Sequence, residues 1–347
     1  MIRKQVRLIL CILFSIAILV GCATPTEMAT LPPPMDTQVP PTKTQPQPTD
    51  TPVPLTPTLK SSPTKPALLV EPGKIVGRVD IGGRSLFIRC EGVGSPTIIL
   101  EGGMGMNTQD WNLNGVYSDL TMVTRTCAYD RANMGASDKT PLPRTVQDMV
   151  NDLHTLLINA NILGPYVLVG HSGGAWVVVL YAWQYPEGVV GMVLLDDVPP
   201  DTGLRMSAVM PTETPNESVT LTEARNYWAT WYDWYNKTYP YDREGWDILN
   251  SAKQVRAVTS LGDMPLLVLT ASFGYAAMHG GTGVPEINQM VSDTWVDLQQ
   301  ELAALSTNGR QITVPNSEHY IWLDEPGAAA ISSEIRSFVR KIQVSLP

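Results

Sequence analysis

Residues 165–176 read Pro-Tyr-Val-Leu-Val-Gly-His-Ser-Gly-Gly-Ala-Trp. Tyr166–Val169 is apolar and rich in β-branched residues, as a buried parallel strand requires, and the residues after the glycines have helical composition. Gly170, Ser172 and Gly174 therefore form a Gly-x-Ser-x-Gly motif on a tight turn between a strand and a helix, which is the setting of a nucleophilic serine. Gly and Ser are common enough for the pentapeptide to arise by chance, so its placement decides the interpretation.

The composition limits the possible partners. A chain of 347 residues with 44% hydrophobic residues can form one large domain or two ordinary ones with a sizeable core. The formal net charge of −9 argues against a nucleic-acid partner.

The first 21 residues have the pattern of an export signal. A basic start is followed by the apolar run Leu8–Val20, which is short for a membrane span and fits a secretory signal peptide. The run ends in Leu19-Val20-Gly21-Cys22, which resembles the lipobox of bacterial lipoproteins. This resemblance implies that 1–21 is removed and that Cys22 becomes the lipidated first residue. The alternative is an uncleaved anchor with an incidental cysteine; both place the remaining chain outside the cytoplasm.

Residues 22–66 predict a disordered tether. Among the 44 residues from Ala23 to Pro66 there are 13 Pro and 11 Thr and no aromatic residue. Such a segment cannot bury enough apolar surface to offset its ordering entropy. We therefore expect one folded domain, 67–347, held away from a membrane or wall.

Apolar strands alternate with helical segments through this domain. Two runs joined by Gly82-Gly83 predict a hairpin, and the helical spacing of apolar residues from Val146 to Leu157 predicts an amphipathic helix before the serine motif. The predicted strands are 75–80, 84–90, 97–100, 124–129, 166–169, 189–195, 266–270 and 311–314. Strands that alternate with helices indicate a mostly parallel α/β sheet covered on both faces.

Four motifs in order give the chain a family resemblance. They are a glycine loop at 101–105, the segment Ala128–Asp138, the serine motif, and Asn316-Ser317-Glu318-His319. Over roughly 75–342 the chain resembles the α/β-hydrolase superfamily. The resemblance implies an eight-stranded sheet whose second strand is antiparallel, with a small cap inserted after the sixth strand.

The cap corresponds to about 199–261 and is rich in aromatic residues. Its rings either pack the cap onto the main domain or line an acyl pocket over Ser172, and both can hold. The aromatic residues are Tyr227, Trp228, Trp231, Tyr232, Trp234, Tyr235, Tyr239, Tyr241 and Trp246.

The resemblance also assigns a base and an oxyanion hole. Of the four histidines, His319 follows the last strand, where the family has its base, whereas His154, His171 and His279 occupy other positions. The oxyanion hole is expected from the backbone N–H groups of Gly173 and Met104. The glycine loop lacks the histidine usual at its start, and a shift of one residue would make Gly103 the donor.

The acid departs from the commonest family pattern. No carboxylate follows the seventh strand until Glu286, but Asp196 and Asp197 end the sixth strand, where a minority of the family has its acid. Strand parity and this likeness favour Asp196, with Asp197 capping the strand end or facing solvent. The alternative is that Glu286 or Asp293 serves as the acid.

Only two cysteines remain in the exported domain, Cys90 and Cys127. The family strand order places the second and fourth strands side by side, so an oxidising compartment favours a disulfide between them. Two buried free thiols are the alternative.

A serine nucleophile excludes the dehalogenase and epoxide hydrolase branches of the superfamily, which use Asp. We expect a lipid-anchored serine hydrolase that cleaves small or acyl carboxylic esters with Ser172, His319 and Asp196 and needs no cofactor and no metal. The alternatives are a peptidase, thioesterase or C–C hydrolase, or a noncatalytic envelope-binding protein on the same scaffold. The sequence leaves the natural substrate and the oligomeric state open.

Overall fold

The computed structural model describes residues 68–235, 244–272, 281–323 and 325–346, with backbone alone at 232–235. The predicted signal peptide, Cys22 and the tether to residue 66 lie outside the described residues. Nine strands form one sheet in the order β1-β2-β3-β5-β4-β6-β7-β8-β9. They are β1 (Leu69–Glu71), β2 (Lys74–Asp80), β3 (Ser85–Glu91), β4 (Thr97–Glu101), β5 (Thr126–Tyr129), β6 (Tyr166–His171), β7 (Val189–Leu195), β8 (Leu266–Ala271) and β9 (Gly309–Val314).

The sheet is parallel from β5 to β9 and antiparallel at the other end. β3 pairs antiparallel with both β2 and β5, as the resemblance implied for the second predicted strand. The sheet has one strand more than the eight expected, because β1 pairs with β2 through a turn at Pro72-Gly73. All three residues of β1 are exposed, so the strand has no buried face, and its sequence Leu-Val-Glu shows no alternation of apolar and polar residues.

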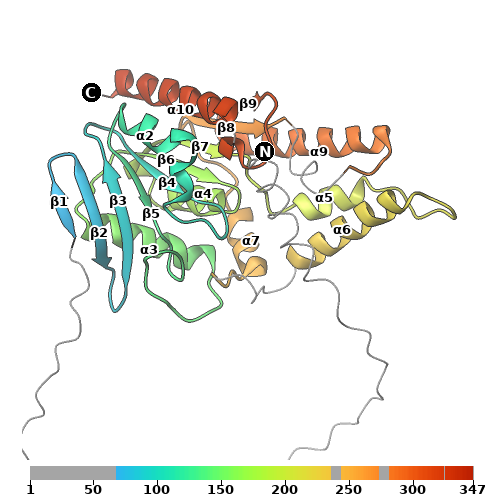
Figure 1. Cartoon of the computed structure of the whole chain (residues 1–347), viewed down its shortest axis with the longest axis horizontal. Helices are drawn as coiled ribbons and strands as arrows, with labels where there is room; N and C mark the ends of the chain where they lie inside the picture. The colour runs from blue at the N-terminus through green and yellow to red at the C-terminus, as the bar shows by residue number, and fades with distance from the viewer. Residues whose placement is uncertain (1–67, 236–243, 273–280, 324, 347) are drawn as a thin grey trace, which may run out of the picture. The chain divides into compact units, whose positions relative to one another are not determined.

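Apolar side chains cover both faces of the sheet. Along β7, Leu194 enters one core, whereas Val193 and Leu195 enter the other. The first core is covered by α3 (Val146–Asn159), α4 (Gly174–Gln184), α7 (Ile248–Arg256) and α9 (Pro285–Ala303), and the second by α2 (Val116–Thr121) and α10 (Glu325–Ser345). Figure 1 shows α10 and α2 on one side of the sheet and α3 on the other. The described residues also contain the short 3-10 helices η2 (Asp110–Gly115), η3 (Pro186–Gly188) and η4 (Ile321–Leu323).

The predicted cap is present between β7 and β8. It contains α5 (Thr202–Ala208), α6 (Val219–Tyr235) and α7. Trp228 and Trp246 are buried, and the ring of Trp246 meets that of Trp176 in α4 edge to face, with centroids 6.4 Å apart. The contact between Trp246 and Trp176 packs the cap onto the main domain. The side chains of the five aromatic residues from Tyr232 to Tyr241 lie outside the described residues.

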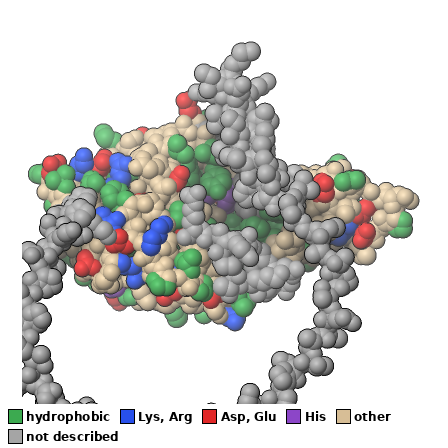
Figure 2. All heavy atoms as spheres, turned by 60° about the horizontal axis from the view of Figure 1, so that its bottom comes forward, with side chains coloured by type: hydrophobic (Ala, Val, Ile, Leu, Met, Phe, Trp, Pro, Cys, Tyr) green, Lys and Arg blue, Asp and Glu red, His purple; other side chains and the backbone are tan. Residues whose placement is uncertain are grey.

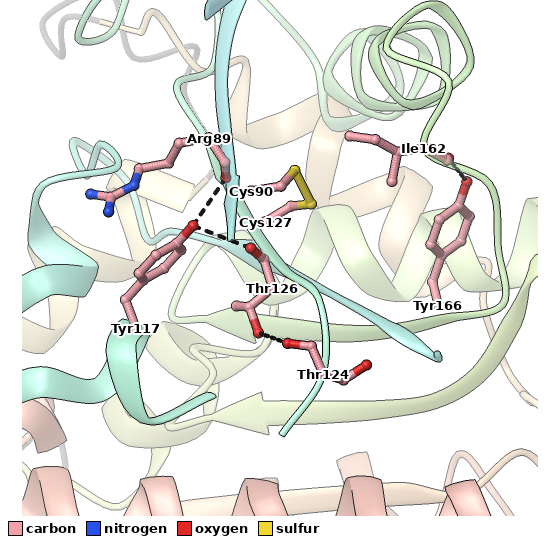
Figure 3. The surroundings of a disulfide bond; sticks show 8 residues. All are labelled: Arg89, Cys90, Tyr117, Thr124, Thr126, Cys127, Ile162 and Tyr166. Carbon is pink, nitrogen blue, oxygen red and sulfur yellow. Dashed lines mark hydrogen bonds between the residues drawn. A yellow bond between two sulfur atoms is a disulfide. The ribbon is translucent and has the colours of Figure 1, made fainter. Parts of the chain in front are cut away.

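A disulfide joins Cys90 to Cys127, as predicted. The two residues face each other across the antiparallel pair β3 and β5, and both are buried. Figure 3 shows Tyr117 beside them, its hydroxyl donating to the carbonyl oxygens of Thr126 (3.2 Å) and Arg89 (3.4 Å).

Candidate active site

Ser172 lies on a strained turn between β6 and α4. Its φ of +51° is left-handed, and an added Cβ at Gly174 would overlap the carbonyl oxygen of Gly102. A Cβ at Gly170 would lie 2.5 Å from Val178 Cγ2 and 2.8 Å from Ala175 Cα. Both flanking glycines are therefore sterically required, as the motif predicts.

The structure brings Ser172, His319 and Asp196 together. His319 Nε2 is 2.9 Å from Ser172 Oγ, and His319 Nδ1 is 2.8 Å from Asp196 Oδ2. An ionised carboxylate only accepts, so the proton of neutral His319 belongs on Nδ1 and leaves Nε2 free to accept from the serine hydroxyl. Asp196 and His319 are buried, and Ser172 is 8% exposed. Of the other histidines, His154 lies half-buried on α3 and His279 lies outside the described residues.

Asp196 is fixed by groups from three elements. Beside the contact with His319, its Oδ1 accepts from Ala271 N (2.9 Å) in β8 and from Trp295 Nε1 (3.1 Å) in α9. The alternative acids Glu286 and Asp293 are exposed on α9, and Asp293 accepts from Gln289 there. Asp196 thus occupies the position expected of the acid.

Of the two expectations for Asp197, exposure to solvent is wrong, because the residue is only 1% exposed. Its carboxyl accepts a backbone hydrogen bond from Val198 at the strand end, whereas Oδ1 has no hydrogen-bond partner among the described residues. Burial raises the pKa of this carboxyl well above its usual value. The chain turns into the cap immediately after β7, and α9 lies against this end of the strand, where Gln299 Nε2 donates to the Asp197 carbonyl oxygen (2.7 Å).

The glycine loop lies against the serine turn. An added Cβ at Gly103 would be 3.1 Å from Ser172 Cβ, and one at Gly173 would be 3.1 Å from Met104 Cγ. Gly103 N–H is engaged, because it donates to Met106 Sδ at 3.1 Å. The N–H groups of Met104 and Gly173 have no acceptor in the part of the chain that the structure describes. This geometry favours Met104 over Gly103 as the loop donor.

Comparison with known proteins agrees with this geometry. Residues 102–331 match the alpha/beta hydrolase family. The chain belongs to this family. YqjL of Bacillus subtilis strain 168, a protein described as uncharacterized, is 27% identical over 237 residues, which cover 68% of this chain and 81% of YqjL.

Solved structures show the same fold at low identity. A thermophilic esterase from Thermogutta terrifontis is 19% identical to this chain, with a TM-score of 0.51. The match covers 77% of this chain and 98% of the esterase. The haloalkane dehalogenase DatA from Agrobacterium tumefaciens C58 is 16% identical to this chain, with a TM-score of 0.52. The match covers 78% of this chain and 97% of DatA. At these identities the likeness establishes the fold alone.

His171 holds the loop that carries His319. Its Nε2 donates to the carbonyl oxygen of His319 (3.1 Å), and the centroids of the two rings are 4.8 Å apart. Burial and the nearby His319 hold the pKa of His171 well below its usual value, so its ring is neutral. No role was predicted for His171, because a residue next to the serine on a sharp turn is expected to point elsewhere.

A buried charge network beneath the glycine loop was also missed. Arg131, which follows β5, pairs with Glu101 at the end of β4 and with Glu244 in the cap. The available signal was Glu101, a carboxylate that ends a buried strand directly after the apolar run Ile98–Leu100. A carboxylate in such a place is expected to have a buried cationic partner. Across the described residues, no group of three or more His, Cys, Asp or Glu is placed to hold a metal ion, and no helix is long and apolar enough to cross a membrane.

Proposed function

We propose that this protein is a lipid-anchored serine hydrolase that cleaves carboxylic esters through an acyl-enzyme. The observation that supports this proposal best is the position of His319, whose two ring nitrogens lie within hydrogen-bond distance of Ser172 Oγ and Asp196 Oδ2. Figure 2 shows a hollow on one face of the molecule in which hydrophobic side chains gather around a histidine. An apolar hollow suits an acyl or alkyl group.

The proposed reaction follows from these contacts. Ser172 Oγ attacks the ester carbonyl while His319 Nε2 takes its proton, and Asp196 stabilises the imidazolium that forms. The oxyanion accepts hydrogen bonds from the N–H groups of Met104 and Gly173. His319 then protonates the departing alcohol, and the acyl group remains on Ser172 until water, deprotonated by His319, releases the acid.

The N-terminal pattern supports the proposed location. We infer that residues 1–21 direct export, that Cys22 carries the lipid, and that the segment to residue 66 spaces the hydrolase domain from the membrane. A serine hydrolase at that position acts on substrates outside the cytoplasm.

The first prediction tests the triad with p-nitrophenyl esters of increasing acyl length. We expect Ser172→Ala to abolish turnover and Asp196→Asn to lower kcat about 10⁴-fold, because the base loses its orienting acid. Asp197→Asn is the matched control, since it makes the same change at the adjacent residue, and it should retain activity within about threefold of wild type. The acyl length with the highest kcat/KM reports the size of the acyl site.

A fluorophosphonate probe separates catalysis from mere binding. It should label the wild type and leave Ser172→Ala unlabelled, because the probe reacts only with an activated serine. Absence of labelling in the wild type would favour a noncatalytic binding protein. Labelling without ester turnover would point instead to a peptidase, thioesterase or C–C hydrolase.

A further inference from the structure

The guanidinium of Arg131 holds the loop that carries the proposed oxyanion donor. Its Nη1 donates to the carbonyl oxygen of Gly102 (2.5 Å) and its Nη2 to that of Gly103 (2.7 Å). The Gly103 carbonyl belongs to the same peptide group as the Met104 N–H. In a planar trans peptide these two bonds point in opposite directions, so fixing the Gly103 oxygen toward Arg131 aims the Met104 N–H the other way.

The carboxylates of Glu101 and Glu244 hold Arg131 in turn. Glu244 accepts from Arg131 Nε (3.0 Å) and Nη2 (2.8 Å), and Glu101 accepts from Nη1. With the two carbonyls, these contacts use all five guanidinium N–H donors. Burial opposes the charge on Arg131, yet Glu244 and Glu101 raise its pKa, so the cation persists at any working pH. Burial raises the pKa of Glu101, and Arg131 partly opposes this rise.

Glu244 brings the cap into this arrangement. It lies between α6 and α7, more than a hundred positions from Arg131 in the sequence, and is 1% exposed. Its Oε1 also accepts from Gly105 N at 2.9 Å, so it contacts the glycine loop directly. Its Oε2 accepts from Trp246 Nε1 at 2.5 Å, and the ring of Trp246 lies 5.6 Å from the Arg131 guanidinium.

Stability alone is a weak explanation for such a network. A buried ion-pair network is often no more stabilising than apolar residues of the same volume, because desolvating the charges costs as much as their attraction returns. Here the donors of Arg131 fix carbonyl oxygens on a loop of small residues that has no regular secondary structure. A planar fork of donors can fix two neighbouring carbonyls at once, which a lysine ammonium cannot do with the same geometry.

We propose that Arg131 is the positioning residue of the oxyanion hole and that Glu244 makes the hole depend on the seated cap. This inference rests on the proposed serine-hydrolase function. When the cap residue Glu244 is in place, Arg131 is fully bonded and the Met104 N–H points at the reacting carbonyl. When the contact between Glu244 and Arg131 is lost, the Gly103 oxygen keeps its bond from Met106 N (3.1 Å). Arg131 then holds the Gly103–Met104 peptide less firmly, and the Met104 N–H is a weaker donor to the oxyanion.

The second prediction concerns Arg131→Lys and Glu244→Gln. We expect each to lower kcat about 10- to 100-fold with KM within about twofold, because an oxyanion donor acts on the transition state and adds little to substrate binding. Glu244→Gln keeps the side-chain volume, so it tests the inference even where Arg131→Lys folds poorly. The rate of fluorophosphonate labelling should fall in parallel, while Ser172 still labels to completion at long times.

Arg144→Lys is the matched control. Arg144 is another buried arginine; its side chain pairs with Asp152 in α3 (2.7 Å), and its backbone contacts the same part of the cap through Gly245. This variant should lose thermal stability to a similar degree and keep kcat. The inference is overturned if Arg131→Lys and Glu244→Gln keep wild-type kcat, or if Arg144→Lys loses kcat to the same extent. The proposed function fails separately, if Ser172→Ala retains activity.

Discussion

Ser172 directly follows β6 and Asp196 directly follows β7, two neighbouring parallel strands. Both residues have a left-handed backbone, with φ of +51° at Ser172 and +43° at Asp196. Such a conformation costs about 1–3 kcal/mol in a residue other than glycine. Each residue is held by the neighbouring strand, since Ser172 N donates to Leu195 O (3.1 Å) and Asp196 N to Leu269 O (2.8 Å). The sheet thus stabilises two strained residues at the site where their side chains meet His319.

The third prediction concerns the buried carboxyl of Asp197. Its pKa is raised in the folded protein, so the native state keeps a proton that the unfolded chain releases. The free energy of unfolding therefore falls as pH rises from the usual aspartate range toward the raised native pKa. Asp197→Asn removes this loss. We expect its Tm to exceed that of the wild type increasingly with pH, by about 2–4 °C per kcal/mol recovered, in thermal unfolding from about pH 4 to about pH 8.

Asp263→Asn serves as the control for that series. Asp263 is exposed in the turn before β8, so replacing it should leave the pH dependence of Tm close to that of the wild type. A Tm difference between Asp197→Asn and wild type that stays constant over the pH range would show that Asp197 is ionised in the folded protein.

The strands were the most predictable elements. Each predicted strand is present within about two residues, because each is an apolar run bounded by turn-forming residues. β5 begins at Thr126, whereas the sequence predicted a start at Thr124. The Thr124 hydroxyl donates to the carbonyl oxygen of Pro96, so Thr124 belongs to the loop before the strand. β1 was missed because a strand with no buried face has no apolar periodicity.

The site was predictable only where sequence neighbours determine it. Ser172 is marked by its flanking glycines. The absence of a carboxylate between β8 and Glu286 removed the commoner position of the acid, and strand parity with the family resemblance then favoured Asp196. The contact between Arg131 and Glu244 joins a loop of the main domain to the cap, and no local pattern predicts such a pairing. His171 was missed for the same reason, because its partner His319 is distant in sequence.

The fourth prediction concerns the disulfide between β3 and β5. By the loop-entropy relation, a bridge across 37 positions stabilises the fold by about 4 kcal/mol. We expect the double variant Cys90→Ala, Cys127→Ala to lose about this much in urea unfolding followed by tryptophan fluorescence. Its kcat should be unchanged at low temperature, because the cysteines lie on β3 and β5, and β4 separates β5 from β6 and β7, the strands that lead to Ser172 and Asp196.

A reductant distinguishes stabilisation by the disulfide from stabilisation by packing of the two cysteine side chains. Dithiothreitol should destabilise the wild type and have no effect on the double variant. If the wild type is equally stable with and without reductant, the two cysteines are free thiols in solution.

The whole chain combines a hydrolase domain with an N-terminal segment of different composition. The family match spans residues 102–331, and the described fold begins at residue 68. The Pro- and Thr-rich segment before it can reach on the order of 100 Å when extended at about 3.1 Å per residue. We propose that a segment of this length lets the lipid-anchored hydrolase domain act at a distance from the membrane.

The fifth prediction tests the anchor at Cys22. Its thiol is the proposed site of lipid attachment, and burial of the attached acyl chains is what would retain the protein at the membrane. We expect Cys22→Ala to appear in the soluble fraction or as an unprocessed precursor, measured by membrane fractionation and by the mass of the N-terminal peptide.

Cys11→Ala is the matched control, because Cys11 lies within the apolar run of the signal and its replacement should leave both readouts unchanged. Ester hydrolysis by the released Cys22→Ala protein should equal that of the wild type, since the site is built from residues that begin at the glycine loop. Unchanged fractionation together with unchanged processing would show that Cys22 is incidental and that the apolar run itself holds the chain.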